Sequence, residues 1–354
     1  MKIGFVRRGH SDTGGAEAYL LRLAGALQAM GEETVLVTTE GWPEGRWTGG
    51  EILRLPGRSP VEFAAAVRGA KTGCDVLFSL ERAPGCAVHR AGDGVHAAWL
   101  RRRDAFEPVW KRAMRWMNRK HSQILELEEE VFDPANTRIV IANSNMVRDE
   151  ILSRFNFPEG RVRVVYNGLE PIPDLPAKAA AREMLGIEPG IFCVLFLGSG
   201  WERKGLGLAI RAVERLDNAV LLVAGRGPIG KFPGRKAEFL GPVSNLAPVL
   251  AASDIMALPT WYDPFSNACL EALAAGMPVV TTTANGFSEI IEPGVHGDVV
   301  EPGDGDALWR ALSGWQSGGR CDAFAGACRD LARGFSIERN ARATLEAIRS
   351  AVDP

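Results

Sequence analysis

Short apolar runs that are typical of buried strands alternate with helical patterns along almost the whole chain, and this alternation constrains the fold more than any other feature. Strands are predicted near residues 2–6, 34–38, 51–55, 75–79, 138–142 and 162–166, and again near 192–197, 219–224, 254–258, 278–282 and 298–300. Strands separated by helices form parallel sheets with both faces covered. The pattern therefore predicts an α/β protein with doubly wound, Rossmann-like sheets.

Three prolines, Pro171, Pro173 and Pro176, separate the two series of strands. The chain has 354 residues, of which 46% are apolar and 24% charged, and this is enough for two domains with ordinary cores. We expect an N-terminal domain over residues 1–170 and a C-terminal domain over residues 178–333. The two halves are expected to face each other across a cleft, because ligands of open α/β sheets bind outside the carboxyl ends of the strands.

The composition excludes several classes of protein. The net charge of −2 argues against a nucleic-acid partner. Neither a Cys-x-x-Cys pair nor a metal-binding spacing with the five histidines occurs, so we expect reduced thiols in a cytoplasmic protein. The apolar run between Met1 and Ser11 is too short for a signal peptide, and charged residues or prolines interrupt every long apolar stretch, so no membrane span is expected. The cysteines are Cys74, Cys86, Cys193, Cys269, Cys321 and Cys328.

The segment from Tyr262 to Ala272 carries two carboxylates, Asp263 and Glu271, eight residues apart. A helix is expected to begin after the good N-cap Ser266, which places Asp263 in a loop and Glu271 on the helix. A helix N-terminus offers unpaired N–H groups and a partial positive charge, so it can hold anionic or hydroxyl-rich ligands without a metal. The alternative is an ordinary N-terminal acid followed by an exposed helical glutamate.

Two adjacent cations follow the strand predicted at 192–197. Arg203 and Lys204 precede a helical pattern that begins at Leu206, so they lie in a strand-to-helix loop. Such loops line the ligand crevice of parallel sheets, and Arg and Lys there would neutralise a diphosphate. The alternative is that both side chains are simply solvated.

Gly14 and Gly15 lie between the first predicted strand and the first predicted helix, where glycines permit close approach of a phosphate, although any tight turn of this kind favours them. These glycines resemble a feature of the GT-B retaining glycosyltransferases of family 4. The other segments that carry the resemblance are Arg203-Lys204-Gly205, the pair Asp263 and Glu271, and Gly276-Met277-Pro278-Val279-Val280. The match spans both halves of the chain.

Within that family, Ala91 to His96, the basic segment after it, and Tyr262 to Asn267 resemble the lipopolysaccharide core α-1,3-glucosyltransferases that act on heptose. The family usually has Glu where this chain has Asp263. The shorter side chain still reaches a sugar hydroxyl, but it leaves the donor sugar open among glucose, galactose and an N-acetylhexosamine. The resemblance also implies that a final helix within residues 337–354 packs back on the N-terminal domain.

The resemblance implies a set of donor-binding residues. Arg203 and Lys204 would stabilise the charge on the leaving diphosphate, and Glu271 would take the ribose hydroxyls. Asp263 would bind the hydroxyls of the sugar, which the backbone N–H groups of Phe265, Ser266 and Asn267 would position. The expected donor-binding residues are Gly14, Gly15, Gly198, Arg203, Lys204, Arg226, Asp263, Phe265, Ser266, Asn267 and Glu271.

Asp93 and His96 lie in a glycine-flanked loop of the N-terminal half, where they would face the acceptor and orient its hydroxyl. The leaving phosphate is an alternative proton acceptor, and a structural hydrogen bond is an alternative role for His96. With these two, the expected catalytic residues are Asp93, His96, Arg203, Lys204 and Asp263.

Two other motifs compete with this interpretation. The segment Gly225 to Gly230 matches the dinucleotide fingerprint, but no helical stripe follows it and no strand ends in an acid about 20 residues on. The resemblance places it near the donor, which makes Arg226 a diphosphate or base contact. Asp304-Gly305-Asp306 looks like a metal-binding Asp-x-Asp, yet it precedes a helix in a glycine-rich turn where capping is expected. We therefore expect no metal site.

The segment 99–120 carries eight cations and two acids, a net charge of +6. Trp99, Arg103, Phe106, Trp110, Ala113 and Met117 fall on one face of a helical wheel. The segment therefore predicts an amphipathic helix that binds an anionic membrane surface. The alternative is an ordinary helix with its aromatic side chains packed inside.

The expected function is retaining transfer of a hexose, with glucose preferred, from a UDP-sugar to a hydroxyl of a lipopolysaccharide core or similar glycolipid acceptor. No cofactor and no metal are expected. The enzyme is expected in the cytoplasm, peripherally associated with the inner face of the cytoplasmic membrane. A sugar-nucleotide epimerase or phosphorylase on the same fold, or a catalytically silent sugar-binding module, are the alternatives.

Overall fold

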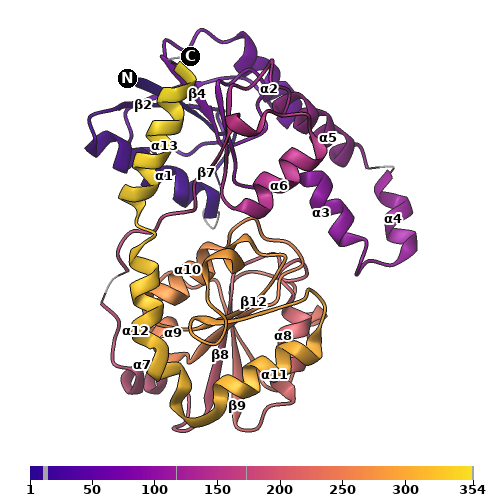
Figure 1. The fold of residues 1–354 in the computed structure, drawn as a ribbon, viewed down its shortest axis with the longest axis vertical. Helices are drawn as coiled ribbons and strands as arrows, with labels where there is room; N and C mark the ends of the chain where they lie inside the picture. Colours follow the sequence, from indigo (N-terminus) through magenta and orange to yellow (C-terminus); the bar gives the residue numbers. More distant parts are fainter. Residues whose placement is uncertain (11–14, 117, 173, 353–354) are drawn as a thin grey trace. The chain divides into compact units, whose positions relative to one another are not determined.

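The computed structural model describes residues 1–10, 15–116, 118–172 and 174–352 (Figure 1). The chain forms two compact units. Unit 1 comprises Met1–Glu170 together with Ile337–Pro354, and unit 2 comprises Pro171–Ser336.

Unit 1 is built on a seven-stranded parallel sheet with the strand order β3-β2-β1-β4-β5-β6-β7. The strands are β1 (Lys2–Val6), β2 (Glu33–Thr38), β3 (Glu51–Arg54), β4 (Val76–Ser79), β5 (Val88–Ala91), β6 (Ile139–Ala142) and β7 (Val162–Val164). The helices are α1 (Gly15–Ala29), α2 (Pro60–Gly69), α3 (His96–Arg103), α4 (Val109–Trp116), α5 (Arg119–Val131), α6 (Asn145–Arg154) and α13 (Ile337–Val352), with a 3₁₀ turn η1 (Glu159–Arg161). The order reverses beside β1, which is a topological switch point.

Successive side chains of β1 lie on opposite faces of this sheet. Phe5 packs with Leu20 and Leu23 of α1, whereas Val6 packs with Phe63 of α2. Side chains of a strand alternate between the two faces of the sheet, and helices cover both faces here. The side chains that β1 directs to either face are therefore apolar.

The last helix, α13, completes the core of unit 1 next to α1 (Figure 1). Its residues Ala341, Leu345 and Ile348 belong to the same core cluster as Phe5. The Tyr19 hydroxyl of α1 donates to Asn340 Oδ1 at 2.9 Å, and the Ile337 N–H donates to the Leu169 carbonyl at 2.8 Å. The C-terminal helix is therefore a structural part of unit 1.

Unit 2 is built on a six-stranded parallel sheet with the order β10-β9-β8-β11-β12-β13. The strands are β8 (Phe192–Leu197), β9 (Ala219–Ala224), β10 (Ala237–Gly241), β11 (Ile255–Leu258), β12 (Val279–Thr282) and β13 (Gly297–Val300). The helices are α7 (Lys178–Met184), α8 (Leu206–Glu214), α9 (Ala247–Ala252), α10 (Asn267–Ala274), α11 (Gly305–Gln316) and α12 (Arg320–Arg333), with 3₁₀ turns η2 (Ile229–Lys231), η3 (Gly286–Ile290) and η4 (Ser317–Gly319). The prediction of two doubly wound α/β sheets is confirmed.

Two strands were not predicted. β5 carries His89 and Arg90, both 4% exposed, and polar residues at buried positions conceal a strand from a search for apolar runs. The Arg90 guanidinium is accommodated because it stacks 3.9 Å from the centroid of the Tyr19 ring. β10 is an edge strand without a fully buried position, so it too lacks a strong apolar signal.

The single amphipathic helix expected over 99–120 is wrong. α3 ends at Arg103, α4 begins after Pro108, and α5 begins after its N-cap Asn118. Proline lacks the N–H that would continue the helix and clashes with the preceding turn, so the segment breaks there. Among the described residues, no helix combines the length and apolar content that a bilayer crossing requires.

Candidate functional site

The loop between β8 and α8 is shaped by glycines that bring two cations to the carboxyl edge of the unit 2 sheet. Gly205 has a φ of +79°, and a Cβ added to it would lie 2.0 Å from the Pro259 carbonyl oxygen. Gly198, at the end of β8, has a φ of +128°, and a Cβ there would lie 2.6 Å from Lys204 Nζ. Glycine is the residue that fits both positions, and the Lys204 ammonium therefore lies directly on the backbone of Gly198.

The Asp263 carboxylate forms ion pairs with both cations of this loop, Arg203 and Lys204. Its Oδ2 atom lies 3.7 Å from Arg203 Nη1 and 3.8 Å from Lys204 Nζ. The carboxylate side chain is 10% exposed, the lysine 12% and the arginine 33%. Both distances exceed that of a hydrogen bond, so the carboxylate keeps its capacity to accept hydrogen bonds from a ligand. The three predicted residues therefore form one charge cluster.

The backbone of this cluster is fixed by hydrogen bonds across neighbouring loops. The Trp261 N–H donates to the Arg203 carbonyl at 2.8 Å, and the Asp263 N–H donates to the Ala284 carbonyl at 3.0 Å. The Asp263 carbonyl in turn accepts from the Gly286 N–H at 2.9 Å. The charged groups are thus held by loops that follow β8, β11 and β12, which are neighbours in the sheet.

The N-terminus of α10 adjoins Asp263 in the sequence, and its cap is the predicted one. Ser266 Oγ accepts from the Cys269 N–H at 3.4 Å, which places Glu271 on the helix and Asp263 in the loop before it, as expected. One expected contact needs correction. The Ser266 N–H donates to Asn285 Oδ1 at 3.2 Å, so it is satisfied within the protein and is not offered to a sugar. Phe265 is 4% exposed.

The segment that carries Arg226 packs against the same loop between β8 and α8. A Cβ on Gly225 would lie 2.2 Å from the Gly198 carbonyl oxygen, and the Arg226 N–H donates to Ser199 Oγ at 3.2 Å. Gly227 packs against the Trp201 ring, where an added Cβ would come within 2.2 Å. The structure therefore brings exposed Arg226 next to the β8 loop.

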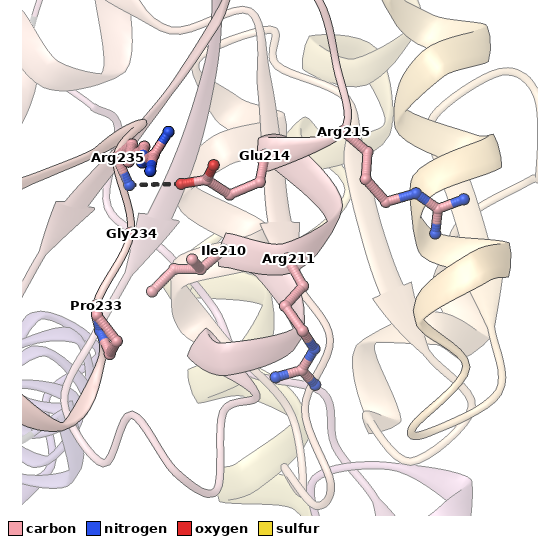
Figure 2. A pocket seen from close by; sticks show the side chains of 7 residues that line it. All are labelled: Ile210, Arg211, Glu214, Arg215, Pro233, Gly234 and Arg235. Atoms are coloured by element: carbon pink, nitrogen blue, oxygen red, sulfur yellow. Dashed lines mark hydrogen bonds between the residues drawn. The ribbon is translucent and has the colours of Figure 1, made fainter.

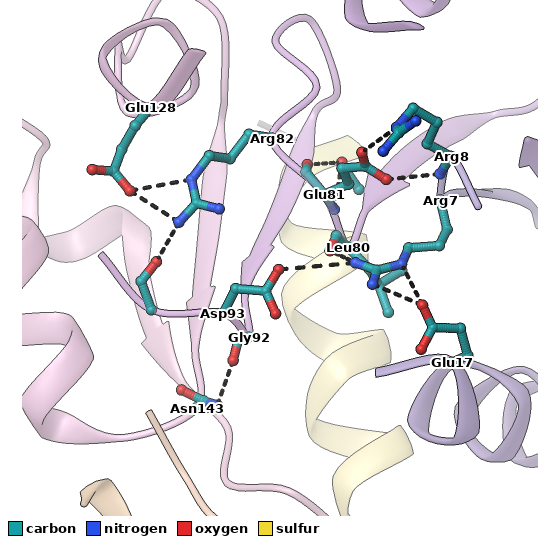
Figure 3. A network of polar contacts seen from close by, with 12 residues as sticks. Arg7, Arg8, Glu17, Leu80, Glu81, Arg82, Gly92, Asp93, Glu128 and Asn143 are labelled. Carbon is teal, nitrogen blue, oxygen red and sulfur yellow. Dashed lines mark hydrogen bonds and ion pairs between the residues drawn. The ribbon is translucent and has the colours of Figure 1, made fainter. Parts of the chain in front are cut away.

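In unit 1, Gly14 lies outside the described residues, and Gly15 is the exposed first residue of α1. Asp93 follows β5, and its side chain is 57% exposed. Its Oδ2 lies 3.9 Å from Arg7 Nη1, and Arg7 also pairs with Glu17 at 2.8 Å (Figure 3). Asp93 is thus an accessible carboxylate that is paired with the Arg7 guanidinium.

His96 is the first residue of α3. Its Nε2 lies 3.0 Å from His121 Nδ1, so one imidazole donates to the other. Burial, followed by the charge of Arg82 and the neighbouring His121, lowers the pKa of His96 to about 3. The imidazole is therefore neutral near pH 7, which suits it to orient a hydroxyl and makes it a weak general base.

The comparisons with known proteins agree with this architecture. The sequence model of the Glycosyltransferase Family 4 matches residues 13–171, and that of the Glycosyl transferases group 1 matches residues 192–315. The chain belongs to the family 4 glycosyltransferases.

Curated relatives of this family 4 chain match over part of their length. It is 31% identical over 237 residues to an uncharacterized glycosyltransferase of Methanocaldococcus jannaschii, covering 60% of each chain. It is 30% identical over 227 residues to a D-inositol 3-phosphate glycosyltransferase of Mycolicibacterium gilvum, covering 59% of this chain and 50% of the relative. The chain thus spans about half to 60% of the length of the curated relatives it matches.

Solved structures share the fold over nearly the whole family 4 chain. WaaG, a glycosyltransferase involved in lipopolysaccharide biosynthesis, superposes with a TM-score of 0.83 at 20% identity, covering 98% of this chain and 99% of WaaG. Anabaena HepE in complex with UDP and glucose superposes with a TM-score of 0.76 at 17% identity, covering 99% and 100%. The expected GT-B fold is confirmed.

The two competing motifs have structural roles in this chain. The three-residue turn η2 overlaps the end of the fingerprint Gly225 to Gly230 and no α-helix begins there, so the segment has no helix N-terminus to hold a pyrophosphate. Asp304 Oδ1 accepts from the Ala307 N–H at 2.8 Å and caps α11, while Asp306 pairs with Arg215 at 2.5 Å. Among the described residues, no three His, Cys, Asp or Glu side chains gather as metal ligands.

An open hollow lies along α8 and the segment before β10 (Figure 2). Arg211, Arg215 and Arg235 line it, and the Glu214 carboxylate between them accepts the Arg235 N–H at 2.5 Å. None of the residues predicted to bind the donor lines this hollow. Its arginines therefore belong to unit 2 but not to the predicted donor site.

Sequence reasoning missed several residues of both candidate sites. Trp201, 2% exposed, donates its Nε1–H to the Gly198 carbonyl at 3.0 Å and packs on the Arg226 segment. Arg7 follows β1 directly and Arg82 follows β4. Polar residues immediately after buried strands are the available signal, because the carboxyl ends of parallel strands meet at one edge of the sheet.

Proposed function

We propose that this family 4 chain is a metal-independent, retaining glycosyltransferase that moves a hexose, with glucose preferred, from a UDP-sugar to a sugar hydroxyl of a lipopolysaccharide core or similar glycolipid. The observation that carries the proposal is the cluster of Arg203, Lys204 and Asp263 beside the N-terminus of α10. Two fixed cations and one ionised carboxylate, held by three neighbouring loops, match the needs of a diphosphate and a hydroxyl-bearing sugar.

The cations would act on the leaving group. Negative charge grows on the diphosphate as the glycosidic bond breaks, so preorganised cations stabilise the transition state more than the bound donor. Lys204 is well placed because its ammonium is held against Gly198 and its side chain is only 12% exposed, which strengthens its electrostatic effect. With a lysine and an arginine in this position, charge stabilisation does not require a divalent ion.

Asp263 would accept hydrogen bonds from the hydroxyls of the transferred sugar, and Glu271 from the ribose. Asp263 balances the charges of Arg203 and Lys204. A bound diphosphate would take over part of that balance, leaving the carboxylate oxygens for the sugar. Asp93 and His96 would orient the acceptor hydroxyl.

The complex of HepE with UDP and glucose supports a UDP-hexose as the donor. WaaG, a glycosyltransferase involved in lipopolysaccharide biosynthesis, supports a glycolipid acceptor. A relative of the chain is named for D-inositol 3-phosphate, and a structural neighbour is a sucrose-phosphate synthase, so the names within this fold do not refer to one acceptor class.

A membrane-facing role is proposed for the helices α3 and α4 at the inner face of the cytoplasmic membrane. Val109 and Trp110 at the start of α4 are 76% and 61% exposed, next to the cation Lys111. An exposed aromatic beside a cation suits the lipid headgroup region. By contrast, Arg102 and Arg103 are paired with Glu150 and Glu107 at 2.8 and 2.6 Å, so they contribute less free charge than the sequence suggests.

Vesicle sedimentation tests this role. The double substitution W110A/K111A should reduce binding to vesicles of phosphatidylglycerol and phosphatidylethanolamine several-fold, because it removes the exposed ring and its cation. Equal sedimentation of variant and wild type would contradict the membrane-facing role.

Calorimetric titration in EDTA tests the donor site. The ligands are UDP, UDP-glucose, UDP-galactose, UDP-N-acetylglucosamine and NADH. Micromolar binding of the uridine ligands, weakened by Arg203→Ala and unchanged by Arg211→Ala in the α8 hollow, is expected. Absence of uridine binding, or binding that requires a divalent metal, would refute the proposal.

Turnover separates transferase from its rivals. Release of UDP that depends on an added acceptor is expected for a transferase. An epimerase would convert the UDP-sugar without releasing UDP, and a phosphorylase would require inorganic phosphate.

A further inference from the structure

Glu128 is a buried carboxylate in a helix whose other acids face solvent. It is 1% exposed, whereas its neighbours Glu129 and Glu130 on α5 are exposed and form surface ion pairs. Burying an ionised carboxylate is costly unless charges and hydrogen bonds compensate it. The groups that contact Glu128 therefore indicate the role of its carboxylate.

Glu128 caps a helix other than its own. Its Oε1 accepts from the His96 N–H at 2.6 Å, and its Oε2 accepts from the Ala97 N–H at 3.1 Å. These are the first two amides of α3, whose N-cap residue Val95 supplies no side-chain hydrogen bond. The carboxylate also matches the partial positive charge of the α3 N-terminus.

Arg82 pairs with this carboxylate and holds the loop before α3 (Figure 3). Its Nε and Nη2 lie 3.2 and 3.0 Å from Glu128 Oε1, and Nη2 also donates to the Gly94 carbonyl at 2.9 Å. On the other side of the loop, Asn143 Nδ2 donates to the Gly92 carbonyl at 3.3 Å. The segment 92–97 is therefore fixed at both ends, with Asp93 exposed between the contacts.

We propose that Glu128 and Arg82 are positioning residues of the acceptor side, which set the geometry of Asp93 and His96 through the 92–97 segment. This rests on the proposed function, because it assigns the segment to the acceptor. A plain structural cap is the competing explanation, and it differs in what it predicts for the kinetics.

The same arrangement bears on the acceptor. The N-terminus of α3 is filled by a carboxylate of the protein, so an anionic group of a ligand does not bind there. The segment instead offers the exposed Asp93 carboxylate, which accepts hydrogen bonds from hydroxyls. We therefore expect this segment to contact a hydroxyl of the acceptor rather than an anionic group.

The test compares Glu128→Gln with Glu129→Gln. Both remove a carboxylate from α5, but Glu129 pairs with Arg154 at the surface, where its side chain is 58% exposed. Hydrogen exchange of the intact protein should show faster exchange in a peptide spanning 92–100 for Glu128→Gln only. Unchanged exchange of this peptide would overturn the proposal, whether or not the protein has transferase activity.

Kinetics then separate positioning from general structural loss. With UDP-glucose as donor and deacylated lipopolysaccharide core oligosaccharide as the acceptor probe, Glu128→Gln should raise the acceptor KM about tenfold. The donor KM and the affinity for UDP should stay within twofold of wild type. Equal changes on the donor and acceptor sides would overturn the proposal in favour of a structural cap.

The pairing of the two residues is tested by combining substitutions. If Arg82 acts through Glu128, the double variant Arg82→Gln/Glu128→Gln should raise the acceptor KM no more than the worse single variant. Additive effects would contradict a shared role. A wild-type protein that releases no UDP with any acceptor would refute the proposed function, while the exchange measurement would still decide whether Glu128 fixes the segment.

Discussion

Lys204 gives the most direct test of the proposed stabilisation of the leaving diphosphate. Lys204→Met keeps most of the side-chain volume and removes the ammonium that lies 3.8 Å from Asp263 Oδ2. By analogy with the loss of one oxyanion donor, we expect kcat to fall about a hundredfold, roughly 3 kcal/mol of transition-state stabilisation. Steady-state UDP release measures this.

The matched control is Lys231→Met in the turn η2, where the lysine is exposed. It should keep the wild-type kcat. If Lys204→Met also keeps it, the charge cluster is not the site at which the leaving group is stabilised.

His96 gives a prediction about pH. Because burial holds the pKa of His96 near 3, well below its ordinary value, the folded state stays unprotonated there while the unfolded chain gains a proton below about pH 6.5. The contribution of His96 to the free energy of unfolding is therefore fully present above about pH 6.5 and is lost as the pH falls from there toward 3. Thermal unfolding at pH 7.5 and pH 5.0 should show a smaller loss of Tm for His96→Gln than for wild type.

The same dependence in His96→Gln and wild type would show that His96 is not held neutral in the fold.

Residues that act through their neighbours are those that the sequence concealed. Asp263 and Arg203 follow strands in a recognisable pattern, and the structure brings them together. Glu128 stands in a run of glutamates on an amphipathic helix, and nothing in that run distinguishes the buried acid from the exposed ones. Its position became evident only from its contacts with α3. Long-range capping leaves no local trace in a single sequence.

The loop from β8 to α8 gives a prediction at the scale of an element. Gly205→Ala should destabilise unit 2 by at least about 1–2 kcal/mol, because alanine is strained at a φ of +79° and its Cβ would meet the Pro259 carbonyl. Urea unfolding followed by Trp fluorescence measures the change, and UDP affinity should fall with it because the loop carries Lys204.

The matched control is Gly207→Ala, two residues further on in α8. Its added Cβ would meet nothing closer than 3.5 Å, at the end of the Arg211 side chain. Alanine in a helix interior is favoured over glycine by about 0.5–1 kcal/mol, so this variant should be at least as stable as wild type. Equal destabilisation by both substitutions would show that the geometry at Gly205 is not limiting.

Elements were predictable where burial produces apolar runs and were missed where it does not. β8 and β9 are apolar throughout and were predicted at their observed bounds. β5 includes His89 and Arg90, whose burial depends on partners from distant elements, among them the Tyr19 ring. The helices after residue 99 were misjudged because the helical wheel ignored the break at Pro108.

At the scale of the whole molecule, α13 gives a prediction that separates the two units. Leu345→Ala removes a side chain from the core of unit 1, at a cost of about 2–5 kcal/mol. Thermal unfolding should shift for unit 1, while the affinity for UDP, attributed to unit 2, should not change. Val352→Ala, at a position 36% exposed on the same helix, should leave both unchanged. A parallel loss of UDP affinity in Leu345→Ala would contradict the assignment of UDP to unit 2.

The return of α13 to unit 1 also has a consequence for biosynthesis. Unit 1 begins at Met1 but lacks part of its core until residues 337–352 have been made, after all of unit 2. Domains generally fold in the order in which they leave the ribosome. Here unit 1 is the first to be started but depends on the last residues made, so the part of α1 that α13 covers stays exposed until all of unit 2 has been synthesised. Nascent chains of this protein should therefore depend on chaperones mainly through their first half.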